Sequence, residues 1–193
     1  MSKTIILASK SPRRIELMRQ HGLDPVVSPS QAAEILPETI TPESAVMYLA
    51  FLKSWDTVSK HMDEYDDMIV IGADTVVVYD NKIIGKPSGP SDAFTTLSML
   101  RNNVHSVITG VSIIEKSGNT VSKECFYETT QVHFTSYSDE ELLAYVNTEE
   151  PYDKAGGYAI QQTFGKYVDH IEGDYDNVVG FPVTRVLEYL NKK

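Results

Sequence analysis

Residues 5–16 read Ile-Ile-Leu-Ala-Ser-Lys-Ser-Pro-Arg-Arg-Ile-Glu, an apolar run followed by a polar turn that carries two arginines. The apolar run predicts a strand. A helix is predicted to follow it, because Ser11 is a favourable N-cap residue and Pro12 suits the first helical position. The free N–H groups of a helix N-terminus favour anions, and Arg13 and Arg14 add fixed positive charge. This turn is therefore predicted to bind phosphate.

The chain around this turn is acidic. Its 193 residues include 17 Lys and Arg against 27 Asp and Glu, which gives a formal net charge of −10. Proteins that bind the nucleic-acid backbone without sequence preference carry the opposite charge, so we expect no stable nucleic-acid partner. An acidic protein still binds a small polyanion where a few cations converge and a divalent metal ion screens the surplus carboxylates.

Length and composition predict one domain over residues 1–193. The chain is 41% hydrophobic, which is enough for a buried core, and no Pro-, Gly- or Ser-rich tract divides it. No apolar stretch approaches the roughly 20 residues of a membrane span, and the N-terminus lacks the pattern of a signal peptide. We therefore expect no membrane partner.

Cysteine and histidine usage predicts neither an intramolecular disulfide nor a structural zinc site. Cys125 is the single cysteine, which suggests a reducing, cytoplasmic setting. The histidines at positions 21, 61, 105, 133 and 170 show no paired spacing of the kind that zinc sites use.

The apolar patterning alternates between strands and helices and predicts a mixed sheet with helices around it. Helices are expected from residues 11, 41 and 91, after a capping box at Ser138 and Glu141, and over 182–190. The expected strands cover residues 5–8, 68–79, 82–84, 106–115, 120–134 and 166–171.

Asp74 is a carboxylate inside an otherwise apolar strand pattern, Ile-Gly-Ala-Asp-Thr-Val-Val-Val over residues 71–78. An ionised group buried there without partners would be costly, so something must offset its charge. One interpretation is an Asp that caps a local turn through Thr75. The other is a base or metal ligand at the mouth of a cleft, where Gly72 lets another backbone or a ligand approach closely.

Lys86 follows at the far end of the hairpin that Asp74 begins. If the turn lies at Asp80-Asn81, Lys86 and Asp74 occupy nearly facing positions, and the lysine reaches either the carboxylate or a phosphate beside it. Gly85 and Pro87 fix the backbone on both sides of the cation. The alternative is a solvated turn lysine.

Residues 150–161 combine charge, aromatic rings and glycines, a mixture suited to a loop that folds over a ligand. Gln161 offers both a donor and an acceptor, which discrimination of a nucleobase edge requires. An ordinary surface loop explains the same composition, and the residues alone leave both interpretations open.

Taken together, these segments resemble the Maf family of nucleotide pyrophosphatases over nearly the whole chain. Several long motifs in the right order carry the resemblance. They are Leu-Ala-Ser-Lys-Ser-Pro-Arg-Arg-Ile-Glu-Leu (7–17), Ile-Gly-Ala-Asp-Thr (71–75), Gly-Lys-Pro (85–87), His-Ser-Val-Ile-Thr-Gly-Val (105–111), Glu-Pro-Tyr-Asp-Lys-Ala-Gly-Gly-Tyr (150–158) and Gly-Asp-Tyr-Asp-Asn-Val-Val-Gly-Phe-Pro (173–182).

The resemblance implies an enzyme that cleaves a nucleoside triphosphate between the α and β phosphates, using Mg²⁺ or Mn²⁺, and so cleans the nucleotide pool. It also implies an α/β fold similar to that of the inosine triphosphate pyrophosphatases, with a long twisted mixed sheet and two lobes around a central cleft. A homodimer is what the family suggests.

The resemblance also assigns site residues. Asp74 matches the general base, and Glu34 is the carboxylate that fits beside it as a metal ligand. Lys53, matched by its spacing within one helix, and Lys86 complete the catalytic set. The residues implied to contact the substrate are Ser9, Arg13, Arg14, Thr75, Lys154 and Gln161.

Within the family, residues matching Arg13, Thr75 and Gln161 mark the subgroup that prefers dTTP and UTP, and all three are present. The substrate is then a normal or a modified pyrimidine nucleotide. The alternatives are a 7-methyl-GTP pyrophosphatase, or a non-catalytic nucleotide-binding regulator of cell division. A buried carboxylate that faces phosphates argues against a pure binder.

Overall fold

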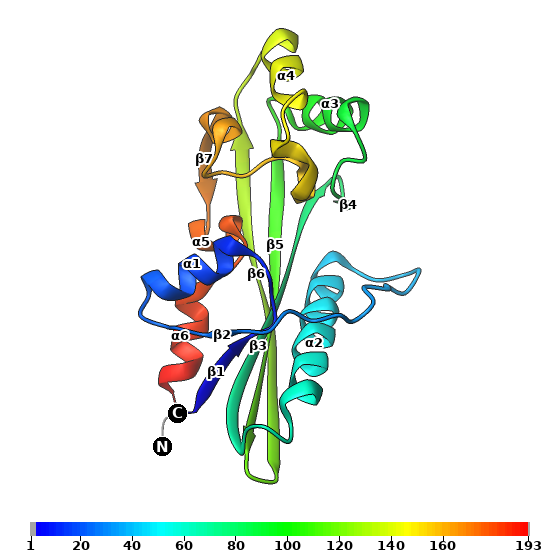
Figure 1. Ribbon diagram of the computed structural model, residues 1–193. Coiled ribbons are helices and arrows are strands. Elements are labelled where there is room, and N and C mark those ends of the chain that lie inside the picture. The colour runs from blue at the N-terminus through cyan, green and yellow to red at the C-terminus, as the bar shows by residue number, and fades with distance from the viewer. Residues whose placement is uncertain (1–2, 193) are drawn as a thin grey trace. The chain divides into compact units, whose positions relative to one another are not determined.

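The strands of the chain pair in a mixed β-sheet (Figure 1). The computed structural model describes residues 3–192, and in that part of the chain seven strands pair in the order β2-β1-β3-β5-β6-β7, with β4 on β3. Strand β1 is parallel to β2 and β3, whereas β4 and β7 are antiparallel to their partners. The strands are β1 (Thr4–Leu7), β2 (Val26–Val27), β3 (Asp67–Tyr79), β4 (Lys82–Ile84), β5 (Val104–Ser117), β6 (Thr120–Phe134) and β7 (Val168–Glu172).

Six α-helices accompany these strands in residues 3–192, and none of them is both long enough and apolar enough to cross a membrane. They are α1 (Pro12–Gln20), α2 (Pro42–His61), α3 (Pro90–Leu100), α4 (Asp139–Val146), α5 (Tyr175–Val179) and α6 (Val183–Asn191). The predicted α/β class with a mixed sheet is confirmed. The sequence pattern missed β2 and α5, because elements of two and five residues are too short to show a period.

The chain forms two compact units. Unit 1 comprises the described parts of Met1–Asp74, Thr109–Glu128 and Gly180–Lys193. Unit 2 comprises Thr75–Ile108 and Thr129–Val179, so that β3, β5 and β6 each contribute a segment to both units. The single domain over residues 1–193 and the cleft between two lobes stay predictions.

Two glycines in unit 1 allow α2 to lie against the sheet. A Cβ atom added at Gly72 of β3 would lie 2.3 Å from the backbone oxygen of Ala50, and one added at Gly110 of β5 would lie 2.5 Å from that of Val46. Real Cβ atoms do not come this close to a backbone oxygen, so both positions require glycine. Gly72 therefore allows the approach of another backbone, which is one of the two predicted possibilities.

Unit 2 is built around aromatic side chains, and two pairs of its polar residues bond to each other. The predicted capping box of α4 is confirmed, because Ser138 and Glu141 each bond the backbone N–H of the other. His105 is buried beside the Tyr158 hydroxyl, with Nε2 and the hydroxyl oxygen 2.6 Å apart, and burial lowers the pKa of His105 to about 4. The buried rings are Phe134, Tyr137, Tyr145, Tyr158, Phe164 and Tyr167.

We predict that Gly72→Ala lowers the free energy of unfolding by about 1–3 kcal/mol, because the new methyl group pushes α2 away from β3. Urea denaturation followed by circular dichroism measures this change. Gly85→Ala is the matched control. Among the described residues nothing lies within 4 Å of a Cβ atom there, and its φ lies outside the left-handed region. A control change below about 0.5 kcal/mol is expected, and an equal loss in both variants would contradict the close-contact explanation.

Candidate active site

The turn after β1 is organised by Ser9. The Ser9 side chain is buried, and its Oγ accepts hydrogen bonds from the backbone N–H of Ser11 at 3.2 Å and from Nη1 of Arg14 at 3.2 Å. Ser11 is the N-cap residue of α1 and Pro12 follows it, as predicted. The Ser11 side chain, however, accepts no capping hydrogen bond within the described chain. Ser9, rather than Ser11, is thus the serine whose side chain is hydrogen-bonded within this turn.

Arg14 connects three parts of unit 1. Its Nε donates to the backbone oxygen of Gly180 at 2.9 Å, and its Nη1 donates to that of Ala73 at 2.9 Å in addition to Ser9. Burial lowers the pKa of Arg14, while the nearby Asp74 carboxylate opposes that shift. The guanidinium therefore fastens α1 to the strand position directly before Asp74. Its predicted contact with a triphosphate stays a prediction.

Asp74 faces a lysine from α2. The Lys53 ammonium lies 2.6 Å from Oδ1 of Asp74 and 2.9 Å from Oε1 of Glu34. The Lys53 and Asp74 side chains are only 14% and 13% exposed, whereas Glu34 is 56% exposed. Asp74 lies inside β3 rather than in a turn, so the turn-capping interpretation is wrong. Its charge is offset by a lysine that comes from a helix distant in sequence.

Glu34, Lys53 and Asp74 together form a small acidic centre that contains one cation. Both carboxylates approach the same ammonium nitrogen, so their oxygen atoms converge near one point. Carboxylate oxygens are the ligands that Mg²⁺ and Mn²⁺ prefer. The donor set therefore fits the divalent ion that the resemblance implies.

Unit 2 contains a second group of predicted site residues, centred on the loop after α4. This loop forms two short 3-10 turns, Glu150–Asp153 and Ala155–Gly157, and the N–H of Gly156 donates to the backbone oxygen of Gly85 at 3.0 Å. The loop is thus tied to the Gly-Lys-Pro segment that carries Lys86, although the ladder between β3 and β4 ends at Ile84.

The four site residues of unit 2 differ in their surroundings. Lys154 is buried, and its Nζ donates to the backbone oxygen of Glu150 at 2.6 Å and pairs with the Asp153 carboxylate. Lys86 and Gln161 are exposed, and Thr75 is half-buried. Unit 1 holds the remaining predicted site residues, which are Ser9, Arg13, Arg14, Glu34, Lys53 and Asp74.

The sequence does not predict that Gly180 is a hydrogen-bond partner of Arg14. The backbone oxygen of Gly180 holds the Arg14 guanidinium, yet a backbone acceptor gives no residue-type signal. The sequence indicates this position only through the Gly180-Phe181-Pro182 motif, which carries the family resemblance.

The comparison with protein families agrees with the motifs placed around Ser9, Asp74, Lys86 and Lys154. A family model described as Maf-like protein matches residues 4–193. The chain belongs to the Maf family. The predicted resemblance is thereby confirmed over residues 4–193.

Several Maf relatives are similar to this chain from end to end. A protein of Agathobacter rectalis, described as a dTTP/UTP pyrophosphatase, is 44% identical over 97% of this chain and 96% of its own length. Proteins with the same description from Caldicellulosiruptor bescii and Geobacillus sp. strain WCH70 are each 42% identical over 98% of this chain, covering 94% and 98% of their own lengths.

One solved structure also aligns with the chain. It is a nucleoside-triphosphatase, described as a dITP/XTP pyrophosphatase, from Mycobacterium abscessus, with a TM-score of 0.41 and 12% identity over 68% of this chain and 72% of the other. A likeness of this size supports no conclusion about the chain.

We predict that Arg14→Lys lowers the free energy of unfolding by about 1.5–3 kcal/mol, because a single ammonium cannot reproduce the fork that reaches Ser9, Ala73 and Gly180. Arg13→Lys is the matched control on the adjacent position, with an expected change below about 0.5 kcal/mol. Urea denaturation of both variants provides the comparison. Equal stability of the two variants would mean that Arg14 does not fasten the turn.

Proposed function

We propose that this chain is a nucleoside triphosphate pyrophosphatase that cleaves dTTP and UTP between the α and β phosphates, releasing the nucleoside monophosphate and pyrophosphate. The observation that carries the proposal is the convergence of Glu34, Lys53 and Asp74 at the end of the Ser9–Arg14 turn. The descriptions of the Maf relatives support the reaction and the pyrimidine preference.

In this proposal Glu34 and Asp74 hold a divalent cation, Mg²⁺ or Mn²⁺. The two carboxylates that contact one ammonium support that assignment, because they already accommodate a cation between them. When bound, the ion supplies positive charge that neutralises the triphosphate.

The side chains of the protein supply the remaining functions. Asp74 orients a water molecule and accepts its proton as the water attacks phosphorus. Lys53, which already contacts Asp74, and Lys86 add positive charge against the phosphates, and Arg14 keeps the turn in place. Positioning and charge stabilisation account for most of the catalysis in this scheme.

Recognition of the nucleotide is assigned to Arg13, Thr75 and Gln161, with Ser9 and Lys154 as further substrate contacts. The exposed amide of Gln161 is able to bond the edge of a pyrimidine base. The physiological substrate in this scheme is a normal or modified pyrimidine nucleotide that is removed from the pool. A cytoplasmic location and a homodimer complete the proposal.

We predict that Asp74→Asn lowers pyrophosphate release from dTTP by about 100-fold or more, because the amide cannot accept the proton of the attacking water. A coupled pyrophosphate assay with Mg²⁺ or Mn²⁺ measures the rate. Glu64→Gln, which changes an exposed carboxylate at the end of α2, is the control and should retain normal turnover.

Two outcomes would overturn parts of the proposal. Near-normal turnover by a folded Asp74→Asn variant would remove the general-base assignment. Release of orthophosphate from the γ position by the unchanged protein would contradict the reaction class, and nucleotide binding without turnover would favour a regulator. A screen of normal and modified nucleoside triphosphates, including 7-methyl-GTP, tests the substrate class in the same assay.

We predict that Gln161→Ala reduces the preference for dTTP and UTP over other nucleotides more than it reduces the rate with the best one. The expected change in the ratio of kcat/KM values is about tenfold, the size of one lost hydrogen bond of about 1.4 kcal/mol. Gln162→Ala, at the exposed neighbouring position, is the matched control. Equal selectivity in the two variants would remove Gln161 from base recognition.

A further inference from the structure

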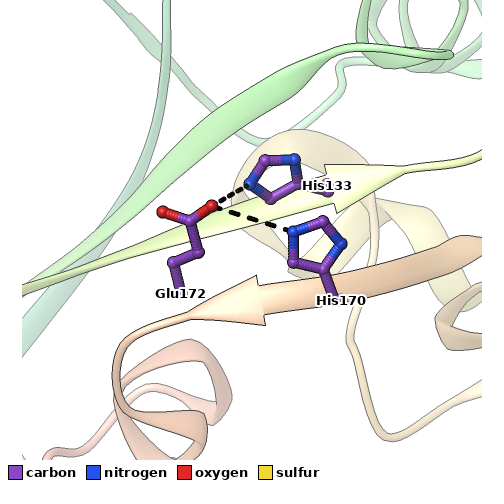
Figure 2. Close-up of side chains that lie close together, drawn as sticks. All are labelled: His133, His170 and Glu172. Atoms are coloured by element: carbon purple, nitrogen blue, oxygen red, sulfur yellow. Dashed lines mark ion pairs between the residues drawn. The ribbon is translucent and has the colours of Figure 1, made fainter.

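Two histidines and a glutamate, none of them assigned to the nucleotide, lie together on the pair of strands β6 and β7 (Figure 2). In the antiparallel register His133 pairs directly with His170, and Glu172 follows His170 by two positions. Directly opposed residues and residues two apart share one face of a sheet, so the three side chains project to the same side. All three belong to unit 2.

The side chains direct their ligand atoms at one another. Oε1 of Glu172 lies 3.2 Å from Nε2 of His133 and 3.8 Å from Nε2 of His170, and Figure 2 shows both imidazoles facing this oxygen. The imidazole centroids are 3.9 Å apart, with 20° between the ring planes. One ligand atom from each of the three residues lies within 4.8 Å of the other two.

The other ring nitrogen of His170 is held by a carboxylate. Its Nδ1 lies 2.8 Å from Oδ2 of Asp169. A histidine that donates its Nδ1–H to a carboxylate presents the lone pair of Nε2, and this is the outer contact that metal-bound histidines commonly make. The His170 ring is therefore oriented with a ligand nitrogen toward Glu172.

His133 contributes a nitrogen that the protein leaves unsatisfied. Nε2 of His133 is inaccessible to solvent and has no hydrogen-bond partner among residues 3–192, even though Glu172 lies within ion-pair distance. A buried polar atom without a hydrogen bond is costly. A ligand bound between the three side chains would satisfy it.

We propose that His133, His170 and Glu172 bind a transition-metal dication of the zinc type. Two imidazole nitrogens and one carboxylate oxygen suit Zn²⁺, whereas Mg²⁺ prefers oxygen ligands, so this site differs in chemistry from Glu34 and Asp74. Tetrahedral Zn²⁺ with bonds of 2.0–2.1 Å places its ligand atoms about 3.3 Å apart. The His133–Glu172 distance of 3.2 Å already meets that value, and the His170–Glu172 distance of 3.8 Å exceeds it by about half an ångström.

The position of the site provides both access and a structural effect. His170 and Glu172 are 51% and 65% exposed, so the ion reaches them from solvent. In the described part of the chain β7 is the last strand in the sheet order, paired only with β6. A metal ion bound by residues of both strands would therefore stabilise the pairing of β7 with β6.

A simple cross-strand ion pair is the competing explanation for this cluster. Exposed pairs of this kind contribute about 0–1 kcal/mol and need no metal. The two explanations differ in a measurable property, because only the metal site binds Zn²⁺ saturably and only through both histidines.

The test is a titration of the chelator-stripped, full-length protein with Zn²⁺ alone, in competition with a colorimetric zinc indicator and without nucleotide. We expect one equivalent to bind saturably, and His170→Gln to weaken that binding by about tenfold or more. His61→Gln is the matched control, because His61 also lies beside a glutamate, at 2.6 Å from Glu64, but is not paired with a second histidine. Its Zn²⁺ affinity should equal that of the unchanged protein.

Two additional measurements distinguish Zn²⁺ binding at His133, His170 and Glu172 from Zn²⁺ binding elsewhere in the molecule. Glu34→Gln should retain the Zn²⁺ equivalent, and Zn²⁺ should raise the Tm of the unchanged protein but not that of His170→Gln. The inference is overturned if the unchanged protein shows no saturable binding, if His170→Gln binds as tightly as the unchanged protein, or if the bound equivalent is lost with Glu34 instead. Far-UV circular dichroism verifies that each variant is folded.

Discussion

The close contact between α2 and the sheet fixes the position of the Lys53–Asp74 ion pair in unit 1. Helix α2 reaches the sheet only because Gly72 and Gly110 have no side chain where it crosses them. Lys53 lies on this helix between Ala50 and Ser54, the two residues that approach Gly72, and its ammonium contacts Asp74. An unpaired carboxylate in an apolar strand would be unfavourable. The packing of α2 on Gly72 brings Lys53 to Asp74 and so supplies the compensating charge.

Arg14 adds a second constraint to the same strand. Its guanidinium bonds the carbonyl directly before Asp74, so the residue is fixed by its backbone neighbour and by its side-chain partner. Two cations from different helices thus hold the position of Asp74, which is the restraint that the proposed general base requires. Acidic residues outnumber basic ones in this chain by 27 to 17, and Arg14 and Lys53 are two of the few cations beside Asp74.

Local features of the fold could be predicted from the sequence, and distant partnerships could not. The strands from residue 68 to 84, the long hairpin around Gly118 and the capping box of α4 follow from apolar periods and turn residues close together in the chain. The match of Glu34 and Lys53 to the site came from the family resemblance. Arg14 bonds Gly180, and His133 pairs with His170 on the neighbouring strand. Both contacts join residues far apart in the chain, so residue spacing in the sequence does not predict them. The histidine spacing predicts no structural zinc site, and the site proposed at His133, His170 and Glu172 depends on this strand pairing instead.

The buried Lys154 ammonium is bonded to its own loop. The ammonium group already bonds the Glu150 carbonyl and the Asp153 carboxylate, which are parts of the same short turn. An anion that takes over this ammonium competes with those two oxygens, so its binding free energy includes the cost of releasing them. The N–H of Gly156 in the same loop also bonds the backbone oxygen of Gly85, directly before Lys86. The two lysines, far apart in the chain, thus lie on segments that a single backbone hydrogen bond joins.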